Sequence, residues 1–209
     1  MGVNTALEVD RIHPRHEDYV PDGDSLRERI LEVAIRLFAT KGYSETSTRE
    51  LVEAAGCTKP ALYYHFDNKA GLFRSAVELA HRRVDVDVEP QPGISFREVL
   101  RESLERLARH VRAKPDDLRL LFRADSYTAL GSQLVDTRSL REGHVDMASQ
   151  ILRGAIAAGE VRPDLPIDEA AISLIGMLHL HLQLSLEGRP LADDFADRIL
   201  SIYMNGVAL

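Results

Sequence analysis

The 209-residue sequence predicts an all-α protein, with a three-helix helix-turn-helix head near the N-terminus and a larger helical body. Apolar residues recur at helical spacing along most of the chain, whereas no alternating strand pattern or internal repeat competes. Capping residues and glycines divide the first part into short helices. The content of 44% hydrophobic and 28% charged residues is ordinary for a globular protein.

Residues 1–23 lack any period and mix Pro, Gly, Asp and His, so we expect a flexible tail. Its His13 and His16 are either solvated or a metal-binding pair, and a solvated tail is the simpler interpretation. A first amphipathic helix is predicted over 25–40, where apolar side chains recur at helical spacing. Gly42 is typical of a residue that ends a helix.

Two short helices follow the first one. Ser47 and Glu50 have the spacing of a capping box at the start of the second helix. Gly56 permits a turn with positive φ, and Thr58 can cap a third helix that ends near Asp67. Two short helices joined by a tight glycine turn, with a longer helix before them, are the plan of a helix-turn-helix unit, here residues 24–70.

The third helix carries four consecutive aromatic or imidazole side chains, Tyr63, Tyr64, His65 and Phe66. A helix that packs on a core buries one stripe at a spacing of three and four, so these four cannot all be buried. Leu62 and Phe66 are four apart and can face the core. The other three can reach a partner, and tyrosine suits the edge of a DNA duplex because its ring packs on sugar and its hydroxyl bonds phosphate.

The stretch KGYSETSTRELVEAAGCTKPALYYHFDNKAGLF resembles the DNA-binding head of the TetR family of bacterial transcriptional regulators. The resemblance covers roughly residues 25–73. The sequence departs from the family pattern at Cys57 and at Leu51-Val52, and both departures keep apolar character. Cys57 is either a redox-sensitive residue or a small buried turn residue, and we favour the second. The matching features are Gly42 with an aromatic next, the Thr/Ser pair before the second helix, Ala55-Gly56, the run Leu62 to Phe66, Lys69 and Leu72.

Ten residues are candidates for DNA contact. The hydroxyl of Thr48 either holds a phosphate at the helix end or only helps to cap it, and Arg49 can read guanine or clamp phosphate. The resemblance implies that the first turn of the third helix points at base edges and that the aromatic run holds the DNA backbone. Pro60 and Ala61 either touch thymine methyls or only initiate the helix. The candidates are Thr48, Arg49, Thr58, Lys59, Pro60, Ala61, Tyr63, Tyr64, His65 and Lys69.

The body, residues 71–209, is predicted to be helical throughout. Its predicted elements are 71–86, 96–113, a segment from Pro115, a short element around 130–135, 138–158, 168–188 and a last helix over about 191–205.

The helix at 168–188 is apolar on almost all faces, so it must be buried on more than one side. We expect it to lie between its own body and a second subunit. The resemblance implies the same arrangement, a four-helix interface between two subunits, here with helices near 140–158 and 168–188. A homodimer also suits an operator with two half-sites.

The resemblance implies that the body binds a small-molecule effector. Met, Leu and Phe at helical spacing more often belong to a plain core than to a ligand site, and a histidine is more often hydrogen-bonded or exposed than a ligand contact. This simpler interpretation stays open for each candidate. An aliphatic lining with a few polar groups suits a mostly apolar ligand. The candidates are Leu104, Leu107, His110, Val111, Phe122, Arg123, Tyr127, Met147 and His179.

Several classes of protein are disfavoured. We find no catalytic triad order, phosphate-binding glycine loop or metalloprotease motif, and expect neither enzymatic activity nor a cofactor or metal. The single cysteine, the absence of a signal-like N-terminus and of an apolar run of about 18 residues favour the cytoplasm and no membrane contact. Residues 24–70 are formally neutral and the chain carries a net charge of −7, which argues against a non-specific DNA-coating protein. The function we expect is a sequence-specific repressor released from its operator by the effector.

Overall fold

The computed structural model describes residues 26–84, 93–126 and 134–207. The prediction of an all-α fold is confirmed, because no strand occurs among the described residues. The predicted tail and most of the predicted element at 130–135 lie outside these residues. The helices are α1 Leu26–Lys41, α2 Thr48–Ala55, α3 Lys59–Phe66, α4 Lys69–Val84, α5 Phe96–Ala113, α6 Pro115–Ser126, α8 Thr137–Ala157, α9 Ile167–Leu186 and α10 Phe195–Val207.

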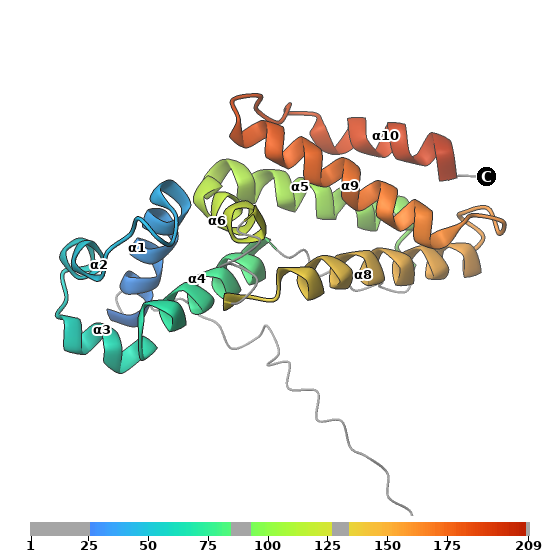
Figure 1. Cartoon of the computed structure of the whole chain (residues 1–209). Coiled ribbons are helices and arrows are strands. Elements are labelled where there is room, and N and C mark those ends of the chain that lie inside the picture. Colours follow the sequence, from blue (N-terminus) through green and yellow to red (C-terminus); the bar gives the residue numbers. More distant parts are fainter. Residues whose placement is uncertain (1–25, 85–92, 127–133, 208–209) are drawn as a thin grey trace, which may run out of the picture.

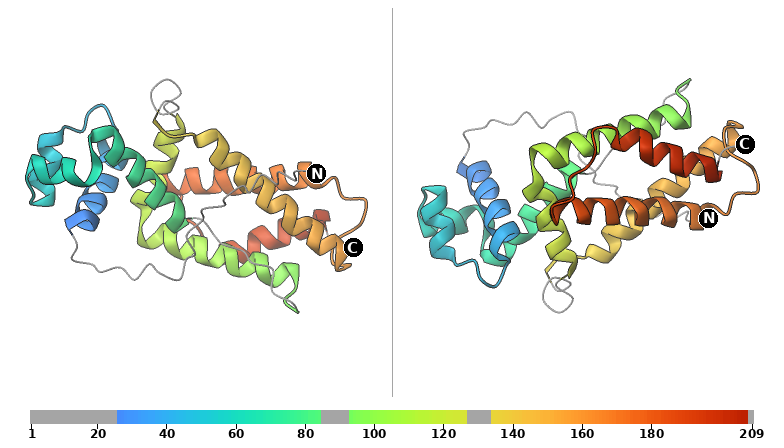
Figure 2. Two further views of the ribbon diagram at one scale, coloured as in Figure 1. Left: turned by 90° about the horizontal axis from the view of Figure 1, so that it is seen from below. Right: turned by 90° about the horizontal axis from the view of Figure 1, so that it is seen from above.

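The helices form a small head and a longer body that lie end to end (Figure 1). The head contains α1, α2 and α3, and α4 leads out of it beneath the body. Helices α8, α9 and α10 extend away from the head, and α5 runs beside α10. The two views of Figure 2 show the head at one end of the elongated molecule. The body therefore places its far end well away from the head.

The capping signals set the bounds of α2 and α3 as predicted. The Ser47 side chain accepts a hydrogen bond from the backbone N–H of Glu50, and the Glu50 carboxylate accepts one from the Ser47 N–H at 2.8 Å. Gly56 ends α2 in the left-handed region at φ +61°, a conformation that a β-carbon disfavours. Thr58 then accepts from the N–H of Ala61 and caps α3.

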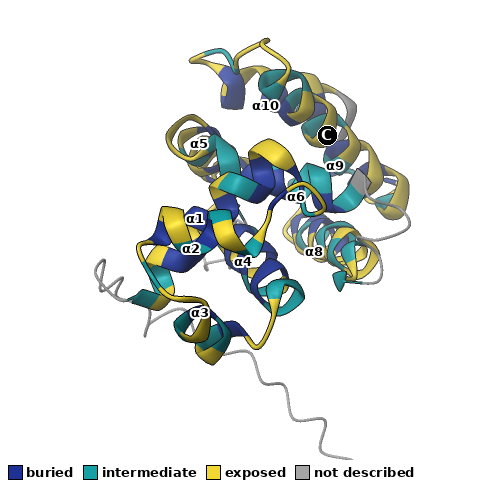
Figure 3. Cartoon of the chain, turned by 60° about the vertical axis from the view of Figure 1, so that its left-hand side comes forward, coloured by how far each residue is buried: buried dark blue, intermediate teal, exposed yellow. Residues whose placement is uncertain are grey.

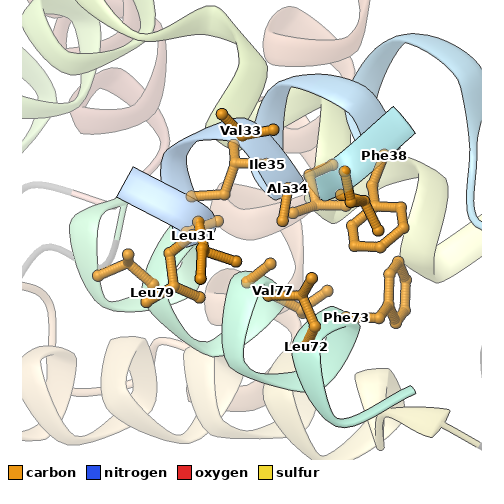
Figure 4. Packing of buried hydrophobic residues seen from close by; sticks show 14 of the residues in the cluster. Leu31, Val33, Ala34, Ile35, Phe38, Leu72, Phe73, Val77 and Leu79 are labelled. Carbon is orange, nitrogen blue, oxygen red and sulfur yellow. The ribbon is translucent and has the colours of Figure 1, made fainter. Parts of the chain in front are cut away.

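The core of the head is built from α1, α2, α3 and α4 as far as Ala80 (Figure 4). Phe38 and Leu72 are fully buried in it, and α6 adds Leu120 and Ala124 from the body. This cluster thus continues past residue 70 along α4. The division of the chain into a head at 24–70 and a body at 71–209 stays a prediction.

A buried carboxylate joins head and body. Asp117 on α6 is 1% exposed, and its Oδ2 lies 2.9 Å from His110 Nε2 on α5. Arg83 on α4 reaches Asp117 Oδ1 at 3.6 Å and also pairs with Glu32 on α1. Burial raises the pKa of Glu32, but its bonds and charges from Arg83 and Lys114 outweigh burial and hold that pKa below its ordinary value.

A second hydrophobic cluster holds the body together between α5, α8, α9 and α10. Tyr203 on α10 donates its hydroxyl to the Ala170 carbonyl on α9 at 3.1 Å, and burial raises the pKa of Tyr203 to about 12. The last helix begins at Phe195 rather than near Leu191, so the predicted start is wrong. Gly188 at φ +100° and Pro190 break the chain, and Leu191 packs on the body from a loop.

Helix α9 is long and apolar enough to cross a membrane by length and composition alone. The expectation that no segment reaches this limit is therefore wrong. A core helix of a soluble protein passes the same test. Here α9 packs along α8 on one side, while Ile172 and Leu180 on another side are 57% and 56% exposed.

Candidate DNA-binding surface and ligand cavity

Helix α3 separates its side chains into a buried and an exposed set. Leu62 is fully buried and Phe66 is 4% exposed, whereas Tyr64 is 85% exposed. Tyr63 and His65 lie between these extremes, and Tyr63 packs partly on the head core. Helix α3 lies at the edge of the head, with a largely exposed outer side (Figure 3). The expected division of the aromatic run into core-facing and outward-facing residues is confirmed, while DNA contact stays a prediction.

The first turn of α3 and the start of α2 carry the other candidates on these helices. Thr58, Lys59 and Pro60 are exposed and Ala61 is half-buried. Lys59 Nζ lies 5.5 Å from the centroid of the Tyr63 ring. At α2, Ser47 rather than Thr48 is the N-cap. The remaining candidates there are half-buried Thr48 and exposed Arg49, which pairs with Glu53 one turn along the same helix at 2.8 Å.

Lys69 begins α4 and rests on an aromatic ring. Its Nζ lies 4.4 Å from the centroid of Tyr43, and Tyr43 packs against Phe73 at 5.1 Å between centroids. Burial lowers the pKa of the Lys69 ammonium below its ordinary value, against the raising effect of Glu45 and Glu50. Tyr43 therefore positions Lys69. The sequence showed an aromatic residue after Gly42 but not that it supports this lysine.

A glycine fixes the turn between α3 and α4. A β-carbon on Gly71 would lie 2.2 Å from the Phe66 carbonyl oxygen, so the two helices approach too closely there for a side chain. Asn68 Oδ1 accepts a hydrogen bond from the Gly71 N–H at 2.8 Å and caps α4. Sequence reasoning missed Gly71, although the spacing N-x-x-G in the turn carries the signal.

Cys57 occupies the turn before α3 and packs partly on the head core. Burial raises the pKa of its thiol, against the lowering effect of the Arg29 charge. A raised thiol pKa disfavours the reactive thiolate. The structure therefore favours the turn-residue interpretation over the redox one.

The body contains a partly open cavity of about 260 Å³ between α4, α5, α6, α8 and α9. Five predicted effector residues line it: Leu104, Leu107, Phe122, Met147 and His179. Three described candidates are not in its lining. His110 bonds Asp117, Val111 packs against α6 and α9, and the Arg123 guanidinium donates to the Thr40 carbonyl at 3.1 Å. Tyr127 lies outside the described residues. Ligand contact stays a prediction for all of them.

The cavity has polar groups that sequence reasoning missed. His81 on α4 and His144 on α8 stack with centroids 5.1 Å apart and planes 10° apart. Arg141 on α8 binds both carboxylate oxygens of Asp125 on α6, at 2.5 and 2.6 Å. His179 packs its ring against Phe122 at 4.5 Å. No sequence pattern links His81 to His144, because their meeting depends on how α4 and α8 pack.

Among the described residues, no cluster of three or more His, Cys, Asp and Glu side chains gathers to hold a metal ion. The site therefore consists of two parts. One is an outward-facing helix with aromatic and basic side chains on the head, and the other is a mostly apolar cavity in the body.

A helix-turn-helix head joined to a body with a ligand-sized cavity defines a class of protein, the ligand-responsive DNA-binding regulators. Residues 30–76 match the family model described as bacterial regulatory proteins, tetR family. The head of the chain belongs to this TetR family, and the chain is a DNA-binding transcriptional regulator. Members of the family are soluble, bind operator DNA, act as dimers and bind small-molecule effectors.

Relatives and solved structures agree with this assignment. The HTH-type transcriptional regulator AcrR of Shigella flexneri is 28% identical over 196 residues, which cover 88% of this chain and 91% of AcrR. A probable acrEF/envCD operon repressor of Escherichia coli K12 is 33% identical over 90 residues, 40% of this chain and 41% of that protein. TylP, a TetR regulator from Streptomyces fradiae, superimposes with a TM-score of 0.70 at 27% identity, covering 88% of this chain and 87% of TylP.

Proposed function

We propose that the protein is a dimeric transcriptional repressor that leaves its operator when a small molecule fills the cavity of the body. Helices α2 and α3 of the matched head supply the operator-binding surface, and the body supplies the effector site and the dimer interface. Relatives support the sign of regulation, since one is described as a probable operon repressor.

One observation carries the proposal: Val77 on α4 belongs to the head core and also lines the cavity. Helix α4 packs against α1 and α3 at its start and reaches the cavity with His81 further along. A ligand that moves this part of α4 therefore moves the α3 surface as well. Coupling of this kind is reciprocal, so operator DNA weakens effector binding by the same factor.

We assign DNA contact to the outward side of α3 and to the helix ends beside it. Tyr64 offers the largest exposed aromatic surface there, and Lys59 and Lys69 supply positive charge next to tyrosine rings. Phosphate contacts carry no sequence information, so recognition of the operator sequence requires contacts to base edges. We expect these contacts from the first turn of α3, around Lys59.

We assign the dimer interface to exposed faces of α8 and α9. On α8, Gly143, Met147 and Gly154 share one exposed stripe, and on α9 Ile172 and Gly176 share another. A β-carbon on any of these three glycines would meet nothing within 4 Å in the single chain. Small residues on exposed apolar helix faces permit close approach of other helices, as a four-helix interface requires.

The test is a fluorescence-anisotropy titration of the full chain with duplex DNA from upstream of its own gene, beside scrambled DNA, at two salt concentrations. Tight saturable binding to the native fragment alone supports a specific regulator, and the bound complex can then be screened for ligands that release it. Equal binding to both duplexes with a steep salt dependence would point instead to a non-specific DNA-binding protein.

A further inference from the structure

We propose that the cavity selects an amphiphilic acid, an aliphatic molecule that ends in a carboxylate, and that His81 and His144 hold the carboxylate. The inference rests on the proposed function, because it names the chemical class of the effector. Its support is the distribution of charge and apolar surface over the described lining of the cavity.

Four polar side chains of the lining come together where α4, α6 and α8 meet, while Ser103 and His179 lie elsewhere in the lining. His81 comes from α4, Asp125 from the end of α6, and Arg141 and His144 from the first half of α8. The remainder of the lining is dominated by aliphatic side chains of α5, α8 and α9, including Leu100, Ile151 and Leu178. A cavity with one polar end and an aliphatic remainder suits a ligand with the same division.

The charged groups of the polar end favour an anionic head group over a cationic one. Asp125 is the one carboxylate in the described lining, and both of its oxygens bind Arg141. An ammonium group would therefore have to compete with the Arg141 guanidinium, whose Nη1 already makes charge-assisted bonds to both oxygens. The described part of the lining offers no second acid to a cation but three imidazoles to an anion.

The stacked imidazoles are suited to a carboxylate. Each ring has two nitrogens, so each imidazole can donate an N–H bond to an anion. With the ring centroids 5.1 Å apart, one carboxylate can accept N–H bonds from both rings. Hydrogen bonds to an ionised acceptor are stronger than those to a neutral one.

The position of the pair also connects it to the head. His81 lies one turn beyond Val77 on α4, and His144 lies on α8, so a bridging carboxylate would tie these two helices together. A ligand that only fills the aliphatic part would not make this bridge.

The experiment compares decanoate with decanamide, which share one chain and differ in charge, by isothermal titration calorimetry of the full-length protein. We expect decanoate to bind at least about tenfold more tightly than decanamide, since the acid alone makes charge-assisted bonds. In the double variant His81→Gln, His144→Gln we expect this preference to disappear while decanamide binding is unchanged. His181→Gln is the matched control, an imidazole on α9 that lies outside the cavity lining, and should keep the preference.

Equal binding of acid and amide to the native protein overturns the inference, and so does a preference that survives in the double variant. Failure of both ligands to bind overturns it as well. If the double variant melts at a lower temperature than the native protein, the single variant His144→Gln replaces it in the same comparison of decanoate and decanamide. Operator titrations with the same samples judge the proposed function separately: release of operator DNA by decanamide as effective as by decanoate would keep the repressor and reject the acid.

Discussion

Neighbouring residues on α3 have opposite tasks, and their substitution should separate folding from binding. Tyr64→Ala removes an 85% exposed ring, so the free energy of unfolding should change by less than about 0.5 kcal/mol. Leu62→Ala empties a fully buried position and should cost about 2–5 kcal/mol. Urea denaturation measures both effects. We expect Tyr64→Ala nevertheless to weaken operator binding about tenfold or more in the anisotropy titration; unchanged affinity would remove Tyr64 from the DNA surface.

Lys69 should act through its charge and not through its packing. Lys69→Met keeps an unbranched apolar chain on the Tyr43 ring but removes the cation. Since a phosphate contact carries no sequence information, affinity for operator and scrambled DNA should fall by similar factors. The slope of log affinity against log salt should become shallower by about 0.9 for each half-site. An unaltered slope would mean that Lys69 makes no phosphate contact. Lys59→Met is the comparison, expected to change sequence preference as well.

The turn between α3 and α4 depends on the absence of one side chain. In Gly71→Ala the new β-carbon would lie 2.2 Å from the Phe66 carbonyl oxygen, and backbone must shift. We expect a loss of about 1–3 kcal/mol in the free energy of unfolding, as for other overpacked sites, together with weaker operator binding. Ala70→Gly, one position earlier in α4, is the control and should cost about 1 kcal/mol through helix propensity alone. A stabilised Gly71→Ala protein would show that this turn relaxes freely.

The contact between α1 and α4 should weaken in acid. The pKa of Glu32 is lower in the folded protein than its ordinary value, because its bonds to Arg83 and Lys114 outweigh burial. Its contribution to stability is therefore present above the unfolded pKa, about 4, and is lost as pH falls through the folded pKa. The side chain is 48% exposed, so the contribution should stay below about 1 kcal/mol.

Urea denaturation of Glu32→Gln over a pH series measures this contribution. The variant should be less stable than the native protein near neutral pH, and the difference should shrink in acid. Glu102→Gln, on an exposed part of α5, controls for the general loss of a negative charge. A difference that does not depend on pH would contradict the assignment.

Features that depend on local signals could be predicted from the sequence, whereas features that depend on tertiary packing could not. The bounds of α2 and α3 followed from Ser47, Gly56 and Thr58, because caps and turns act within a few residues. The start of α10 was misplaced, because Leu191 continues an apolar period although it packs from a loop. The polar end of the cavity could not be predicted, since His81 meets His144 only through the packing of α4 on α8.

At the scale of the whole molecule, two sets of residues join head to body. Val77 and Ala124 contribute to both the head core and the cavity lining, whereas Asp117 on α6 pairs with Arg83 on α4 and hydrogen-bonds His110 on α5. Packed contacts of this kind transmit small displacements because a dense interior does not absorb them. A displacement at the cavity can therefore reach α3 along α4, and also through the contacts that α6 makes with α1.

Dimerisation is the remaining property of the whole molecule, and a leucine on α9 should separate it from folding. A β-carbon on Gly176 would meet nothing within 4 Å in the single chain, so Gly176→Leu should leave the fold of each chain intact. In the proposed four-helix interface the same side chain would keep the partner helix at a distance. We expect the variant to sediment as a monomer at concentrations where the native protein is a dimer. Operator affinity should fall by at least about a hundredfold, because two heads no longer engage two half-sites at once.

The control for this variant is Glu102→Leu, which places the same side chain on an exposed part of α5. Both variants should show the helical circular dichroism of the native protein, and the control should remain a dimer with native operator affinity. A dimeric Gly176→Leu protein with native affinity would move the interface away from this face of α9. The exposed Ile172 and Leu180 on the same helix would then need another partner, because two large apolar side chains that stay in water leave unused a burial worth about 1.5–3 kcal/mol each.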